Sequence, residues 1–417
     1  MKTLRVSALA ILILVNLAGA APFAYVTSMG VDTGTVFVID TATDNLTAVI
    51  PVEGWPFGVT INPEGTKVYV ADLSGLSTTV SIIDTATNKV DAVVNVRGYP
   101  RGVTVNPTGS RIYVTNRYSV VDNNSDNISI IDTSTNRLMD TINVGLSTYN
   151  IAFTLNGEKI YATNSLNNTV SVIDTTTNKV TATVPVGDHP TDIAISPDGN
   201  TVYVTDSGSN TVSVIDKATN RVIATVPVGD GPSDIVVTPD GKKAYVPNKR
   251  SNNVSVIDTS TNTVIATVSV GIAPLGVAVT PDGNKVYVTN AESDNVSVID
   301  TSTNNVISMV NSGKFHMNYP VGVVIGSFLD SEIADQSTTV TANTTKNSGI
   351  EETNLSSDEK NSVKLNNSNN KTDNSSKSND SSTSGGNESR KNNFTPGFSL
   401  LGSLTCMYMG LKLSRKQ

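Results

Sequence analysis

Aspartates recur at fixed places in this 417-residue sequence, and carboxylates at regular spacing are potential calcium ligands. Each closes a VID tripeptide or a variant of it, at Asp40, Asp84, Asp132, Asp174, Asp216, Asp258 and Asp300. A residue present in every copy of a repeat serves the architecture, and an aspartate there can accept backbone N–H bonds in the following turn. An asparagine, which tolerates left-handed backbone, follows at Asn88, Asn136, Asn178, Asn220, Asn262 and Asn304. We therefore predict that both sets build turns.

Side chains for other chemistry are scarce. The two histidines, His189 and His316, and the single cysteine, Cys406, are too few for a copper or zinc centre. His189 with Asp192 offers an acid–base pair, although a histidine that holds a loop between repeats is the simpler interpretation. The inventory argues against an enzyme, and no cofactor is expected.

The elements that position these residues form a repeat. "KVYVTNAESDNVSVIDTSTNNVI" (285–307) returns with small changes at 201–223 and 159–181, and the last five VID copies are 42 residues apart. In the unit 229–270, "DIVVT", "KAYVPN", "VSVID" and "VIATVSV" are four predicted strands separated by turns. Apolar side chains on both faces of these strands favour sheets that are covered on both sides. Four strands per repeat predict the blades of a β-propeller.

Closure of the ring is also predicted. The repeats begin with a second strand, "AYVTS", and end with a first strand, "PVGVVIGSF" (320–328). Pairing of these two strands in one blade would hide both sheet edges. The expected fold is all-β, a seven-bladed β-propeller of four-stranded blades over residues 21–330, with the N- and C-terminal strands sharing one blade.

The combination of "YVTN" with "SVIDT.TN" resembles the YVTN-family β-propeller repeat of archaeal surface-layer proteins. The resemblance covers about three quarters of the chain. It implies a propeller at the cell surface with a structural or adhesive role, and it provides no catalytic residues to transfer.

A specific site is expected where the repeat breaks. The connection to the innermost strand reads G-x-x-P-x-G/D, and its large residues come from neighbouring blades at one mouth of the channel: Trp55, Phe57, Tyr99, Arg101, Tyr149 and Tyr319. Aromatic faces with an arginine suit sugar rings or a peptide of another surface protein. Packing of the channel mouth explains the same residues equally well.

A long insertion, residues 117–127, is expected beside these aromatics. Asp122, Asn124 and Asp126 follow the spacing of a calcium loop, but Asn127 and Thr133 replace its glycine and glutamate, which makes calcium a weak candidate. Asn123 and Asn127 also begin N-x-S/T triplets.

Both ends of the chain indicate export. Residues 1–20 have the charge, apolar run and small residues of a signal peptide. Residues 331–393 have too few large apolar side chains to fold and predict a disordered stalk. N-glycosylation triplets begin at Asn45, Asn167, Asn253, Asn295, Asn343, Asn354, Asn366, Asn370, Asn374, Asn379, Asn387 and Asn393, some of which arise by chance in such a composition.

Residues 394–417 form a hydrophobic segment with a basic end. Pro396, Gly397 and Phe398 resemble a PGF-type archaeal sorting signal, which implies cleavage and attachment to a lipid; the alternative is a short membrane anchor. The net charge of −8 excludes nucleic acid as the expected partner.

The sequence thus predicts a non-catalytic extracellular protein, attached to the cell surface, that recognises glycans or other surface proteins. The alternatives are a spacer of the cell envelope and a propeller enzyme of lactonase or oxidoreductase type.

Overall fold

The computed structural model describes residues 22–326, apart from 31–32, 75–76, 97, 118–125 and 314–316. The predicted signal peptide, stalk and C-terminal segment, with their triplets and the sorting motif, lie outside the described residues, as do Asp122, Asn123, Asn124 and His316. In the part of the chain that is described, none of the elements is an apolar helix of membrane-spanning length.

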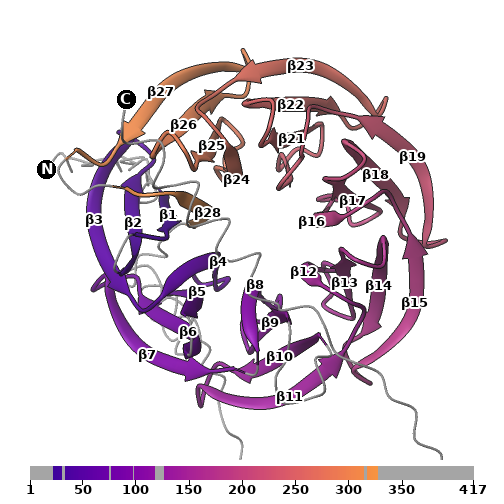
Figure 1. The fold of residues 1–417 in the computed structure, drawn as a ribbon, viewed down its shortest axis with the longest axis horizontal. Coiled ribbons are helices and arrows are strands. Elements are labelled where there is room, and N and C mark those ends of the chain that lie inside the picture. Colours follow the sequence, from indigo (N-terminus) through magenta and orange to yellow (C-terminus); the bar gives the residue numbers. More distant parts are fainter. Residues whose placement is uncertain are drawn as a thin grey trace, which may run out of the picture. The chain divides into compact units, whose positions relative to one another are not determined.

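Seven antiparallel sheets of four strands stand side by side around a common axis (Figure 1). This confirms the predicted seven-bladed β-propeller. Each blade runs from an inner strand near the axis to an outer strand at the rim.

Four sets of strands follow one another from the axis outward. The inner strands are β4 (Trp55–Ile61), β8 (Tyr99–Val105), β12 (Thr148–Phe153), β16 (Pro190–Ile195), β20 (Val236–Val237), β24 (Pro274–Val279) and β28 (Pro320–Gly326). The second strands are β1 (Phe23–Ser28), β5 (Lys67–Ser74), β9 (Arg111–Arg117), β13 (Lys159–Asn164), β17 (Thr201–Asp206), β21 (Lys243–Asn248) and β25 (Lys285–Asn290). The third strands are β2 (Gly34–Asp40), β6 (Ser77–Asp84), β10 (Asn127–Asp132), β14 (Thr169–Asp174), β18 (Thr211–Asp216), β22 (Asn253–Asp258) and β26 (Asn295–Asp300). The outer strands are β3 (Asn45–Val52), β7 (Lys89–Asn95), β11 (Arg137–Asn143), β15 (Lys179–Pro185), β19 (Arg221–Pro227), β23 (Thr263–Ser269) and β27 (Asn305–Asn311).

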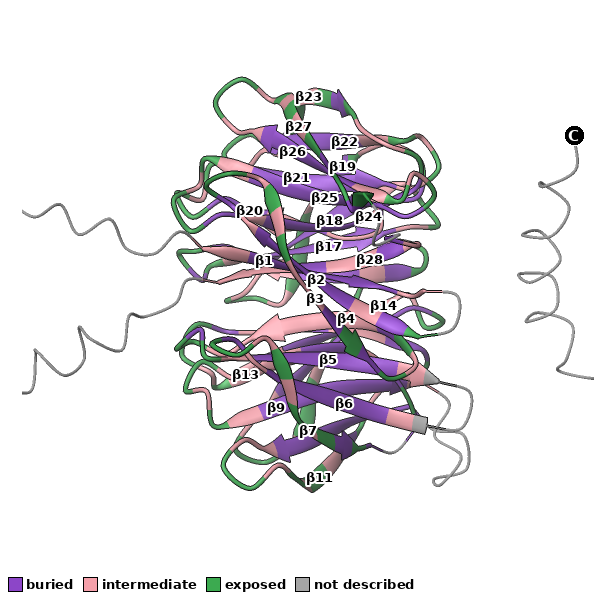
Figure 2. Ribbon diagram, turned by 90° about the vertical axis from the view of Figure 1, so that its left-hand side faces the viewer, coloured by how far each residue is buried: buried purple, intermediate pink, exposed green. Residues whose placement is uncertain are grey.

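The hydrophobic core lies between blades. One cluster joins Tyr25, Val36 and Val38 of the first blade to Val68 and Val70 of the next, and similar clusters follow around the ring. The second and third strands are buried along almost their whole length (Figure 2). The outer strands differ from the expectation, because exposed and half-buried residues alternate along β7 and β27, as on a sheet with one face in contact with solvent.

The turns between third and outer strands form as predicted. The carboxylate of Asp174 accepts the backbone N–H groups of Thr176 (3.0 Å) and Thr177 (2.8 Å), and the other VID aspartates make equivalent bonds. Asn178 adopts a left-handed conformation with φ 55°, as do the equivalent asparagines, while Asp44 takes this place in the first blade.

The ring closes as predicted, because β28 pairs with β1 in an antiparallel register from Phe23–Gly326 to Ser28–Pro320. One inner strand is shorter than expected. The predicted strand 234–238 is reduced to β20, Val236–Val237, with an isolated bridge between Pro232 and Asn248. The carboxylates of Asp192 and Asp234 accept the N–H of Ile235 (3.0 and 2.7 Å), so side chains replace the sheet partner there.

Candidate ligand-binding site at the channel mouth

The inner strands all begin at one end of the central axis, which we call the channel mouth. Pairing places these starting residues beside the ends of the second strands: Trp55 lies opposite Leu73, and Tyr99 lies opposite Arg117. A residue with positive φ directly precedes every inner strand except β20. Gly54 and Gly98 take this place before Trp55 and Tyr99, and Tyr319 takes it before β28. Trp55 and Tyr99 are 37% and 36% exposed at the rim.

Arg101 contacts aromatic rings of both neighbouring blades. Its guanidinium carbon lies 5.0 Å from the ring centroid of Phe57 on β4 and 3.9 Å from that of Tyr149 on β12. The cation is therefore held between aromatic rings of the two neighbouring blades. Such contacts attract a cation to the negative faces of the rings and leave the N–H groups in the guanidinium plane for other partners.

Two further cations reach the channel mouth. The guanidinium carbon of Arg117, at the end of β9, lies 4.8 Å from the Tyr149 ring centroid, and its Nη1 is 3.4 Å from the Tyr149 hydroxyl. Nζ of Lys249, which follows β21, donates to the hydroxyl of Tyr319 across 3.4 Å. We call Phe57, Arg101, Arg117, Tyr149, Lys249 and Tyr319 the mouth cluster.

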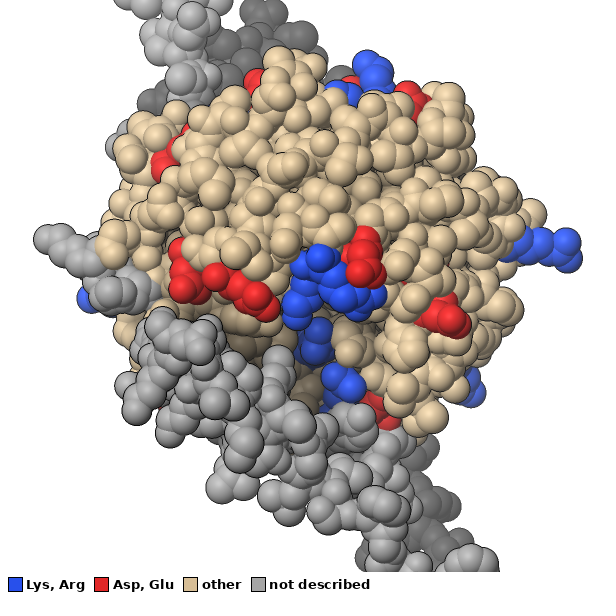
Figure 3. Space-filling view, turned by 45° about the horizontal axis from the view of Figure 1, so that its top comes forward, with Lys and Arg blue, Asp and Glu red and all other residues tan. Residues whose placement is uncertain are grey.

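Burial of Arg101 lowers its pKa to about 10; Tyr149 and Tyr319 act in the opposite direction, and the like charge of Arg117 adds to the lowering. The side chain is still protonated at neutral pH. Figure 3 shows Lys and Arg side chains gathered near the middle of one face, at the border of a hollow, with acidic side chains to either side.

The structure brings some of the predicted site residues into contact and leaves others apart. The structure brings Phe57, Arg101 and Tyr149 into direct contact, whereas Tyr319 interacts electrostatically with Arg101 and accepts a hydrogen bond from Lys249. Trp55 and Tyr99 occupy the rim.

Sequence reasoning did not assign Arg117 and Lys249 to the site. They stand directly after the YVTN element, where Ser165, Ser207 and Ala291 stand in other blades. Comparison of this one position among the repeats would have found them.

Acidic residues line another part of the inner ring. The carboxylate of Asp192 accepts hydrogen bonds from Asn150 and from the N–H of Ile235, and that of Asp234 accepts the N–H of Val277 (2.8 Å). Burial, together with the neighbouring charge of Asp234, raises the pKa of Asp192 well above its ordinary range. Asn150, Asp192 and Asp234 thus link neighbouring blades through their side chains. In the other four blades a glycine stands at this position, and the backbones of neighbouring blades approach each other directly: Gly58, Gly102, Gly276 and Gly322.

His189 does not join this acidic group through a hydrogen bond. Its backbone, at φ 52°, donates to the side chain of Asn168 across 3.0 Å. The geometry favours the structural interpretation of His189 over the acid–base pair.

The calcium and glycosylation candidates have different surroundings. Asp126 is 4% exposed and accepts the N–H of Ser147; among the described residues no three His, Cys, Asp or Glu side chains form a metal-binding group.

Asn45 and Asn167 are exposed, whereas Asn253 and Asn295 are half-buried and accept hydrogen bonds from Asn248 and Asn290. Asn127 is fully buried and bonded to Asn116, which leaves no room for a glycan in the folded blade.

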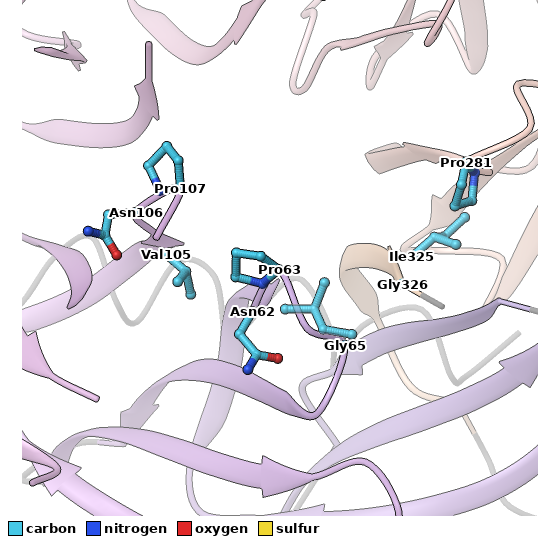
Figure 4. A pocket seen from close by; sticks show the side chains of 10 residues that line it. Asn62, Pro63, Gly65, Val105, Asn106, Pro107, Pro281, Ile325 and Gly326 are labelled. Carbon is cyan, nitrogen blue, oxygen red and sulfur yellow. The ribbon is translucent and has the colours of Figure 1, made fainter. Parts of the chain in front are cut away.

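A cavity of about 270 Å³ lies at the opposite end of the inner strands (Figure 4). Its lining includes Ile61, Pro63, Val105, Pro107 and Ile325, and none of its lining residues is charged. The cavity is thus separate from the mouth cluster, and its polar side chains are those of Asn62 and Asn106.

The fold and the mouth cluster define a seven-bladed β-propeller with cations and aromatic rings at one end of its axis. Residues 150–325, less than half of the chain, match the family described as lactonase, 7-bladed beta-propeller. No curated protein sequence matches the chain.

Solved structures give the same fold. A functionally unknown protein from Desulfotomaculum acetoxidans DSM 771 aligns with 19% identity and a TM-score of 0.63, over 73% of this chain and 99% of that one. The hydrazine synthase of Kuenenia stuttgartiensis aligns with 21% identity and a TM-score of 0.58, over 68% of this chain and 97% of that one. At these identities the likeness concerns the fold alone.

Proposed function

We propose that this protein is a non-catalytic recognition protein whose channel mouth binds a glycan or another surface protein. One observation carries the proposal: side chains from separate blades converge into the mouth cluster, with Arg101 between two rings and exposed Trp55 and Tyr99 beside it. Aromatic faces with cations are well suited to sugar rings and to peptides.

The location that we propose is the cell surface. The signal-like residues 1–20, the polar residues 331–393 and the segment 394–417 support a propeller that is exported and tethered at its C-terminal side. We propose lipid attachment at the Pro396-Gly397-Phe398 motif, with some of the stalk triplets glycosylated. Mass spectrometry of protein purified from cells tests these features, because cleavage and glycans change the mass in opposite directions.

The fluorescence of Trp55, the single tryptophan, tests the recognition role. We expect a saturable change when the full-length protein is titrated with cell-wall polysaccharides or purified surface proteins. A Tyr99→Ala variant removes a neighbouring ring and is expected to weaken binding at least several-fold. No response across the panel would leave the aromatics as packing and the protein as a spacer.

An enzyme is the second candidate, favoured by the match of residues 150–325 to the lactonase family. Its test is hydrolysis of a panel of sugar lactones followed by acid release at constant pH. We expect no turnover above that of buffer. Turnover that an Asp192→Asn variant abolishes would replace the recognition role, since Asp192 is a buried carboxyl group of the inner ring within the matched region.

A further inference from the structure

The guanidinium of Arg101 lacks a polar partner in the described part of the chain. A guanidinium carries five N–H donors in one plane. None of them donates a hydrogen bond to a described residue, and no carboxylate of the described residues lies within 4.0 Å; its neighbours there are the rings of Phe57 and Tyr149. Both contacts are with ring faces, which are not conventional hydrogen-bond acceptors, so the N–H donors of Arg101 have no polar partner among the described residues.

Several other cations among the described residues are paired with carboxylates. Lys285 lies 2.9 Å from Asp44, Arg250 lies 2.8 Å from Asp230, and Lys67 contacts both Asp84 and Asp91. The chain is acidic overall, with 37 Asp and Glu against 29 Lys and Arg, so carboxylates are available for pairing. A partly desolvated cation without a counter-charge is costly, and an anionic ligand would remove that cost.

Arg101 is not the only cation of the mouth cluster. Arg117 stacks on the same Tyr149 ring, and its like charge contributes to the lowered pKa of Arg101. Lys249 donates to the hydroxyl of Tyr319, which itself interacts electrostatically with Arg101. Positive charges that gather around one opening fit a ligand that carries several negative groups.

We infer that the channel mouth binds an acidic glycan, with a uronate carboxylate accepting hydrogen bonds from Arg101 and the flanking sugar rings stacking on Trp55 and Tyr99. This rests on the proposed recognition function and names its ligand class. A carboxylate matches the fork of a guanidinium with two parallel N–H···O bonds. The two exposed rings, on the consecutive inner strands β4 and β8, give sugar faces an apolar surface next to that anchor.

The test compares a galacturonate tetrasaccharide with its methyl ester, which keeps the sugars and removes the charges. Binding to the full-length protein is measured at neutral pH by Trp55 fluorescence and by calorimetry. We expect the acid to bind at least ten-fold more tightly than the ester, and its affinity to fall as salt is raised.

Variants of Arg101 test whether this side chain is responsible for the tighter binding of the acid. Arg101→Gln is expected to lose about ten-fold or more in affinity for the acid and little for the ester. Arg101→Lys keeps a point charge without the fork and is expected to recover only part of the affinity. Arg221→Gln, an exposed cation on the outer strand β19, is the matched control and is expected to bind as the parent does. Thermal melting of each variant checks that the propeller is intact.

The outcomes separate this inference from the function on which it rests. Equal binding of acid and ester overturns the anionic ligand and leaves glycan recognition standing. Arg101-dependent binding of a sulfated tetrasaccharide in place of the uronate keeps the anionic glycan but reassigns its charged group to a sulfate ester. Arg101-dependent binding of an acidic peptide alone overturns the glycan, and binding of none of the probes or of the surface proteins overturns both proposals.

Discussion

At the residue scale, one buried polar position of the repeat makes the stability of the folded protein depend on pH. The last residue of the YVTN element donates its side-chain amide to a serine of the third strand, from Asn116 to Ser129 (2.8 Å) and from Asn248 to Ser255 (2.9 Å). Asp72 occupies this position in its blade and accepts from Ser81 instead. Its second oxygen, Oδ1, is buried without a hydrogen bond from any described residue. An ionised carboxylate at this position opposes folding.

Burial raises the pKa of Asp72 to about 7, only partly offset by Ser81. Because the folded-state pKa lies above the ordinary value of 3.8, stability falls as pH rises from about 4 to about 7 and stays reduced above that. Asp72→Asn is expected to stabilise the protein at pH 8 by roughly 2–4 kcal/mol, with the gain shrinking toward pH 4. Urea unfolding at several pH values measures this; a gain independent of pH would show that ionisation is not its cause.

Asp84→Asn is the matched control, for which we expect a loss of stability at neutral pH in place of a gain. Hydrogen bonds from Lys67 and Thr87 hold the pKa of Asp84 below its ordinary value, so its stabilising contribution is present at neutral pH and is lost as pH falls through the folded-state pKa. We expect a loss of about 1 kcal/mol or less at pH 7, since the pair is partly exposed. The same urea series provides the measurement, and stabilisation at pH 7 would contradict the assignment.

At the scale of elements, the tyrosine of the YVTN strand fastens one blade to a turn of the next. The hydroxyl of Tyr161 on β13 donates to Oδ1 of Asn220, 2.9 Å away in the turn before β19. Tyr245 makes the equivalent bond to Asn304 (2.8 Å), and Tyr287 makes it to Asp44 across the closure. The repeat therefore needs a tyrosine here for a bond between blades as well as for packing.

Tyr161→Phe keeps the ring and removes that bond. We expect a loss of about 1 kcal/mol, because the Asn220 side chain also loses its partner. Tyr203→Phe is the control, since the Tyr203 ring is also buried but its hydroxyl donates to no described residue. Equal losses in both variants, measured by thermal and urea unfolding, would show that the bond between blades contributes little.

Elements with local causes were predictable from the sequence. The VID aspartates and the left-handed asparagines act within four residues of themselves, so the repeat reveals them directly. The short strand β20 was not predictable, because its amide partner, Asp192, comes from the preceding blade. The sequence shows that Lys249 departs from the repeat, but its contact with Tyr319 was not predictable, because that contact depends on where the ring places two distant connections.

At the scale of the whole molecule, the first blade is completed by the last strand. The register joins Phe23 to Gly326, and without β28 the strand β1 would have an unpaired edge and Val323 would leave the core cluster around Ala24 and Val26. Unpaired edges and open cores cost stability and favour association.

Truncation tests this closure. A chain that ends at Tyr319 is expected to lose cooperative unfolding and to form oligomers, whereas one that ends at Asp330 keeps the melting temperature of the full-length protein. Circular dichroism and size-exclusion chromatography distinguish the two. A monomeric, cooperatively folded chain ending at Tyr319 would show that the ring holds without β28.

The same pairing imposes an order on the synthesis of the protein. The six blades from β4 to β27 each consist of consecutive strands, so each can form soon after its own residues are made. Strand β1 must wait for a partner that follows on the order of 300 residues later, and closing a loop of that length costs roughly 5 kcal/mol of chain entropy. Until the ribosome has released residue 326, the edge of β1 stays open to the closing strand of another molecule. Ribosome pausing just before this point, or an excess of nascent chains, would therefore favour exchange of β28 between two copies.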